Sequence, residues 1–172
     1  VEETSLNLDP DRLVDALAAG QKAGLNVVGV IPVGLFGQPA ALDRITTFAQ
    51  GNGPWVLDDA AQSFGATLSG NVVGTFGSAT ATSFFPAKPL GCYGDGGALF
   101  TNDDELAAIA RSARVHGQGA DKYENERLGM TARLDTIQAA VLLAKLGIFD
   151  EELTLRQKAA DRYADKLAGC GV

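Results

Sequence analysis

The feature that most constrains the fold is a pair of apolar runs separated by a helical pattern. Residues 26–37 (NVVGVIPVGLFG) and 55–59 (WVLDD) are rich in Val, Ile and Leu, which is typical of strands buried on both faces. Between them, residues 38–50 have the spacing of an amphipathic helix, with Pro39 near its start. A strand, a helix and a strand of these lengths predict a βαβ unit, and therefore a parallel sheet with right-handed crossovers.

The rest of the chain continues this alternation. Residues 9–24 predict a helix, with acidic residues early and Lys22 late, as the helix dipole favours. Another helix is expected to begin after Asn102 or Asp103, either of which is a good N-cap. Residues 117–133 have no periodicity and predict a long loop. The remaining expected elements are strands at 78–85 and 96–101 and helices at 102–117, 134–146 and 151–167.

Composition and charge exclude several classes of protein. The net charge of −7 disfavours a nucleic-acid binder, which needs a basic surface to hold phosphates. No apolar run reaches the ~18 residues that predict a membrane-spanning helix, so no membrane partner is expected. The chain opens without methionine and without a signal peptide, and it closes on LAGCGV directly after a helical pattern. We therefore expect a fragment that is truncated at both ends.

The histidine and cysteine content predicts no metal site and no Ser-His-Asp triad. His116 is the only histidine, and a structural role is its simplest interpretation. Cys92 and Cys170 lie far apart and form no CxxC pattern, which fits a reduced, cytoplasmic protein.

Lys88 stands in unusual surroundings for a lysine. In SFFPAKPLGCYGDGGALFT (83–101) it lies among aromatics, prolines and glycines, with no carboxylate before Asp95. Burial among apolar groups favours a neutral amine, which a Schiff base requires, and Pro86 and Pro89 would fix the backbone on either side. A surface lysine in a turn is the structural alternative. The nearby glycines 91, 94, 96 and 97 indicate either turns or a close backbone approach to a ligand.

Two aspartates follow the predicted strand at 55–59. Ligands of parallel sheets gather at the carboxyl ends of strands, where Asp58 and Asp59 lie. Adjacent strand residues point to opposite faces, so only one of the two is expected to face a given ligand. The structural alternative is an N-cap for a helix that begins with AAQSF.

Taken in order, several segments resemble one enzyme family. DDAAQSFGA, TSFFPAKPLGCYGDGGALFTND, VHGQG and GMTARLDTIQAAVL are similar to motifs of the DegT/DnrJ/EryC1/StrS family, the nucleotide-sugar aminotransferases that use pyridoxal 5′-phosphate (PLP). The resemblance implies an α/β fold: the large domain of a fold-type I PLP-dependent aminotransferase, a three-layer αβα sandwich with a mostly parallel sheet. Residues 1–150 would be a partial PLP-binding large domain. Residues 151–172 would lead toward a C-terminal small domain.

The resemblance also implies roles for individual residues. Lys88 would bind the cofactor as a Schiff base and later move the proton, and Asp59 would pair with the pyridine nitrogen. Gln62 would hydrogen-bond the phenolic oxygen of the ring, and Ser83 would donate to the phosphate.

Two further residues would act in a homodimer with shared active sites. Arg133 matches the arginine that reaches the neighbouring subunit's site to bind substrate, and a solvated residue in the first turn of a helix is its structural alternative. Thr131 stands where the family commonly has an asparagine that contacts the partner's cofactor phosphate. Threonine keeps one donor, or it caps the following helix.

The implied reaction is transfer of an amino group, with glutamate as donor, to a nucleotide-linked keto sugar in polysaccharide or lipopolysaccharide biosynthesis. A UDP-linked 3-keto sugar acid fits the lysine segment and HGQGADKY best. A 4-keto nucleotide sugar is an alternative. So is a non-catalytic, truncated PLP-fold protein that self-associates through a C-terminal helix stripe of Leu153, Ala160, Tyr163 and Leu167. Lys88 argues against the branch of the family that dehydrates the sugar, which has histidine there.

Overall fold

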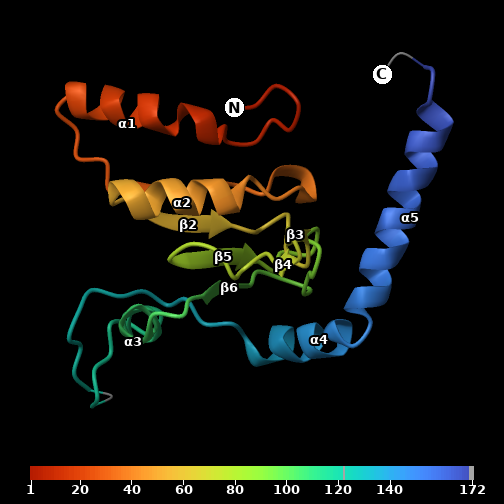
Figure 1. Cartoon of the computed structure of the whole chain (residues 1–172). Helices are drawn as coiled ribbons and strands as arrows, with labels where there is room; N and C mark the ends of the chain where they lie inside the picture. Colours follow the sequence, from red (N-terminus) through yellow and green to blue (C-terminus); the bar gives the residue numbers. More distant parts are fainter. Residues whose placement is uncertain (122, 171–172) are drawn as a thin grey trace.

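A four-stranded mixed sheet forms the centre of the computed structural model, which describes residues 1–121 and 123–170 (Figure 1). The strand order is β1-β2-β5-β6, with β1 parallel to β2, β2 parallel to β5, and β6 antiparallel to β5. The expected α/β fold with a mostly parallel sheet is confirmed. The strands are β1 (Gly29–Val30), β2 (Trp55–Asp59), β5 (Ala79–Ser83) and β6 (Gly97–Phe100).

The first strand is much shorter than the apolar run at 26–37 predicts. β1 lies at the edge of the sheet, and Val28 and Ile31 are each 52% exposed, so burial on both faces was a wrong expectation. Pro32 has no N–H to donate to β2, which interrupts the ladder. Pairing resumes beyond it, because the Asp59 N–H donates to the Pro32 carbonyl and the Gly34 N–H donates to that of Asp59.

One helix packs on the sheet at β2, and a second lies beyond it, farther from the sheet (Figure 1). α1 (Leu13–Lys22) follows a short 3-10 turn (Pro10–Arg12) capped by Asp9, and α2 (Leu42–Asn52) connects β1 to β2. A first apolar core forms here around three side chains that are almost completely buried, those of Leu42, Ile45 and Val56.

A second core lies around the segment that follows β5. It contains the buried side chains of Phe84, Leu90, Cys92, Leu142 and Phe149. The Phe64 ring packs against the rings of Phe84, Phe100 and Phe149, with centroids 5.7–6.2 Å apart. The helices of this half are α3 (Asp104–Ala113), α4 (Thr136–Leu146) and α5 (Phe149–Leu167).

The ends of these elements differ in part from the sequence expectations. Asp103 caps α3 as predicted, since its carboxylate accepts from the N–H groups of Glu105 and Leu106. α5 begins inside the second core at Phe149, and every described residue after Leu153 is exposed, so the helix projects from the rest of the chain (Figure 1). The domain boundary at residue 150 stays a prediction. The last two residues of the predicted segment 151–172 lie outside the described part of the chain.

Three smaller features complete the fold. A 3-10 turn (Leu35–Gly37) precedes α2, and β3 (Thr67–Leu68) pairs with β4 (Asn71–Val72) as a hairpin. The expected loop at 117–133 is closed by antiparallel bridges, Val115 with Thr131 and Gln118 with Asn125; Lys122 lies outside the described residues. Among the helices described, none is long and apolar enough to cross a membrane.

The first core allows a direct stability test. Ile45→Ala should lower the free energy of unfolding by about 2–5 kcal/mol, because Ile45 is fully buried and cannot be replaced without leaving a cavity. Chemical denaturation measures this difference. Val14→Ala on α1 is the control, since a side chain 62% exposed should contribute less than about 0.5 kcal/mol. Equal losses in both variants would contradict this assignment of the core.

Candidate active site

The register of β2 with β5 places Asp59 and Ser83 on one face of the sheet. Asp59 lies beside Ala81, and Ser83 is two residues further along β5, so the three side chains share a face. Asp58 points to the opposite face, beside Thr80, and is 1% exposed. The side chains of the two aspartates therefore point to opposite faces of the sheet, as predicted. Asp58 is buried and Asp59 is half-buried.

Asp59 ends its strand in a turn. Its Oδ1 accepts from the Ala61 N–H at 3.0 Å, which leaves the other carboxylate oxygen for a ligand. Turns, not a helix, occupy residues 61–65, so the structural alternative of a helix N-cap was wrong.

Gln62 has its side-chain amide fixed by the backbone of another segment. The Phe36 N–H donates to Gln62 Oε1 at 3.0 Å, and Phe36 adopts a left-handed φ of 57°. Because the carbonyl end of the amide is bound in this way, the Nε2 group is the end that can donate to a ligand.

Lys88 lies in the loop that directly follows Ser83, the last residue of β5. We call this loop, residues 84–96, the lysine loop. Ser83 Oγ accepts from the Phe85 N–H at 3.2 Å, and the Lys88 N–H donates to the Phe85 carbonyl at 2.8 Å. Both bonds shape the first half of the loop. Lys88 is half-buried, and residues 85–87 before it are exposed, so the expected burial among apolar groups was wrong for the described residues.

The loop glycines make close contacts with the chain itself. A side chain on Gly91 would place Cβ 2.5 Å from the Pro86 carbonyl oxygen, and one on Gly97 would lie 2.7 Å from that of Thr82. Glycines 91, 94, 96 and 97 have no positive φ. Close packing against the chain itself therefore accounts for Gly91 and Gly97, and left-handed turn geometry accounts for none of the four glycines.

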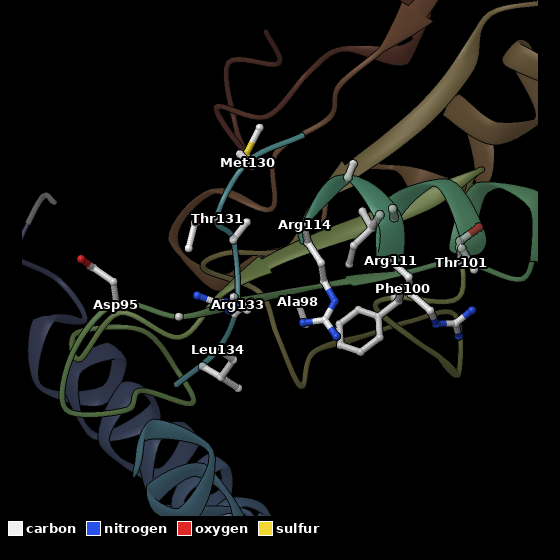
Figure 2. A pocket seen from close by; sticks show the side chains of 18 of the residues that line it. Asp95, Ala98, Phe100, Thr101, Arg111, Arg114, Met130, Thr131, Arg133 and Leu134 are labelled. Atoms are coloured by element: carbon white, nitrogen blue, oxygen red, sulfur yellow. The ribbon is translucent and has the colours of Figure 1, made fainter. Parts of the chain in front are cut away.

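Thr131 and Arg133 lie in a second region, a groove of about 1160 Å³ (Figure 2). Its walls are β6, the end of α3 and residues 130–134, and neither Asp59 nor Lys88 lines it. The side chains of Arg111 and Arg114 flank the Phe100 ring in this groove. Neither arginine was predicted from the sequence, in which their spacing of three residues at the end of a helix was the only signal.

The helix positions expected in the structural alternatives for Thr131 and Arg133 were wrong, whereas the expected solvent exposure of Arg133 is confirmed. α4 begins at Thr136 after the N-cap Asp135, so Arg133 precedes the helix and Thr131 does not cap it. Thr131 Oγ1 lies 3.2 Å from Nε2 of His116, which gives the lone histidine a local partner. Thr131, Arg133 and His116 are all exposed.

A sequence model of the DegT/DnrJ/EryC1/StrS aminotransferase family matches residues 1–172. The chain belongs to this family. It is 48% identical, over 172 residues, to the UDP-2-acetamido-2-deoxy-3-oxo-D-glucuronate aminotransferase of Pseudomonas aeruginosa, covering 100% of this chain and 46% of that protein. It is 38% identical to the dTDP-3-amino-3,4,6-trideoxy-alpha-D-glucose transaminase of Micromonospora megalomicea, covering 93% of this chain and 43% of that protein.

Two solved aminotransferase-type structures have the same fold as the chain. An aminotransferase of the family from Brucella abortus superposes with a TM-score of 0.95 at 50% identity, covering 98% of this chain and 45% of that one. NtdA of Bacillus subtilis with bound cofactor PMP has a TM-score of 0.85 at 27% identity, covering 98% of this chain and 37% of that one. The family is PLP-dependent. The chain spans less than half the length of these relatives.

Asp58 is a buried carboxyl directly behind the site. Burial raises its pKa from 3.8 to about 6; the charge of Asp59 adds to the rise and the Thr80 hydroxyl opposes it. The Thr80 hydroxyl is close but does not form a hydrogen bond with Asp58. Among the described residues, neither carboxylate oxygen of Asp58 nor Thr80 Oγ1 has a hydrogen-bond partner. A charged Asp58 is therefore costly to the folded state.

The raised pKa predicts a pH-dependent stability. Between pH 3.8 and about 6 the folded state retains a proton on Asp58 that the unfolded state has lost, so the contribution of Asp58 to stability falls as the pH rises. The free energy of unfolding of Asp58→Asn relative to wild type should therefore increase across this window and level off above it. Denaturant titrations at several pH values measure the difference. A difference that is constant with pH would contradict the prediction.

Proposed function

We propose that the chain carries the lysine part of a PLP-dependent aminotransferase site that acts on a nucleotide-linked keto sugar. The single observation that carries the proposal is the shared sheet face of Asp59 and Ser83, at the carboxyl ends of two parallel strands, with Lys88 in the loop that follows. Ligands of parallel sheets bind at this end.

The donors and acceptors of the site fit the chemical groups of PLP. The free oxygen of the Asp59 carboxylate can accept from a protonated ring nitrogen, and the Gln62 Nε2 group can donate to the phenolic oxygen. Ser83 Oγ already accepts from the Phe85 N–H, so its hydroxyl proton remains available to donate to a phosphate. In an acidic protein the phosphate has to be held by such local donors.

Each of these residues has a distinct task in transamination. PLP, when bound, supplies the electron sink for the carbanion formed beside the substrate nitrogen. Asp59 keeps the proton on the ring nitrogen by its negative charge. Lys88 would hold the cofactor through Nζ, and its free amine would accept and return a proton during the transfer. Gln62 would donate from Nε2 to the cofactor, and its amide is oriented for this by the Phe36 N–H.

For the substrate we propose a UDP-linked 3-keto sugar acid, with glutamate as amino donor. The 48% identity to the Pseudomonas aeruginosa enzyme supports this choice over a 4-keto sugar. Arg133 would bind a substrate carboxylate or phosphate. Since Arg133 and Thr131 line a groove that excludes Lys88, we propose that they act on the site of a second subunit in a homodimer. The unpaired thiols of Cys92 and Cys170 support a cytoplasmic location.

Trapping of the cofactor tests the proposal. Incubation with PLP followed by borohydride reduction should give a covalent adduct on Lys88, located by peptide mass mapping. Lys88→Arg should lose the adduct, because the guanidinium stays charged. Asp59→Asn should still form it but weaken cofactor binding by about tenfold or more, since a charge-assisted hydrogen bond is lost.

The controls separate specific from general lysine modification. Lys158 is exposed on α5 and reports the background reaction of a surface lysine. Equal labelling of Lys88 and Lys158 would refute the site. A panel of 3-keto and 4-keto nucleotide sugars, assayed for glutamate-dependent amination, then separates the two substrate classes.

A further inference from the structure

The second half of the lysine loop is bound along one side by α4 and α5. Backbone groups of alternate residues are held: Lys145 Nζ donates to the Gly91 carbonyl at 2.6 Å, and the Tyr93 N–H donates to Gln138 Oε1 at 2.8 Å. A longer contact of 3.4 Å joins an Arg156 guanidinium nitrogen to the Pro89 carbonyl. The residues between these contacts, Leu90 and Cys92, are buried in the second core.

The contacts from α4 come from a single helix face. Gln138, Leu142 and Lys145 follow one another at intervals of four and three residues, which places them in line along the helix. Leu142 is 5% exposed and packs in the core with Leu90 and Cys92. This face of α4 therefore has an apolar centre that packs against the loop and a polar group at each end that holds the loop backbone.

Lys145 makes the stronger of the two polar contacts. Its ammonium group is charged, half-buried, and lies 5.2 Å from the centroid of the Tyr93 ring as well as close to the Gly91 carbonyl. Hydrogen bonds from charged donors are stronger than neutral ones, and the ring face adds an attraction for the cation. Two residues of the loop, Gly91 and Tyr93, are thus contacted by one side chain.

We propose that Gln138 and Lys145 are positioning residues for Lys88: by holding residues 91–93 they fix the direction from which the Lys88 amine approaches its ligand. The role rests on the proposed function. Residues 85–87 at the top of the loop are exposed, so the position of Lys88 depends on how the two halves of the loop are held. Ser83 and Phe85 hold the first half, and α4 holds the second. Misplacement of a reacting group by ~1 Å costs on the order of 100-fold in rate.

The first test measures the loop itself, without cofactor. Amide hydrogen exchange of residues 90–94 in the whole chain should become about tenfold faster or more in Lys145→Met, which removes the charged donor but keeps the stem. Gln138→Leu should act in the same direction. Lys145→Arg keeps a charged donor and should remain near wild type. Lys158→Met, on the exposed surface of α5, is the matched lysine control and should change nothing.

The second test measures positioning. The rate of adduct formation on Lys88 at saturating PLP should fall about tenfold in Lys145→Met, while the half-saturating PLP concentration changes little, because Asp59, Gln62 and Ser83 are intact. Lys145→Arg should restore the rate. Circular dichroism and denaturation of each variant establish that it is folded, and Gln138→Leu provides a second route if Lys145→Met is not.

Each outcome decides the proposal. Unchanged exchange in both Lys145→Met and Gln138→Leu would show that α4 does not hold the loop. Faster exchange with a wild-type adduct rate would show a purely structural contact and overturn the positioning role. If the wild-type chain forms no adduct on Lys88, the proposed function and the positioning role fail together, whereas the exchange data still report whether α4 holds the loop.

Discussion

The parallel pairing of β2 with β5 is the constraint on which the candidate site depends. It places Asp59 beside Ala81, and therefore on the same face as Ser83, at the end of the sheet where both strands stop. A shift of one residue in this register would turn Asp59 to the opposite face of the sheet and bring Asp58 to this one. The buried face formed by Val56, Asp58 and α2 opposes such a shift, because it would expose the first core.

Two cores of different character support the two halves of the site. The first core, around Leu42, Ile45 and Val56, fixes the strand that carries Asp59. The second core fixes the loop that carries Lys88, through Leu90, Cys92 and the helices that follow. Because the residues proposed to bind the cofactor come from both halves, their relative position depends on the sheet that joins the cores. Asp59, Ser83 and Lys88 are all half-buried, and the loop that carries the lysine relies on backbone contacts on both sides.

Sequence patterns predicted the elements better than their environments. The helices and the β2, β5 and β6 strands lie where periodicity and capping placed them, since those signals are local. The run at 26–37 was misleading because its composition does not report that it lies at a sheet edge, nor that Pro32 removes a ladder bond. The burial of Lys88 was overestimated for a similar reason: apolar neighbours in sequence, such as Phe85, face solvent in the structure. Contacts between distant segments, such as Lys145 with Gly91, left no sequence signal.

The free thiol in the lysine loop has a practical consequence. Cys92 is fully buried, and its Sγ lies 3.0 Å from both the Phe84 and the Gly94 carbonyl oxygens, whereas Cys170 is exposed. An alkylating reagent will therefore modify Cys170 quickly, and it will modify Cys92 only when the lysine loop opens locally. The labelling rate of Cys92 relative to that of Cys170 thus reports how often the loop opens, and it requires no engineered probe.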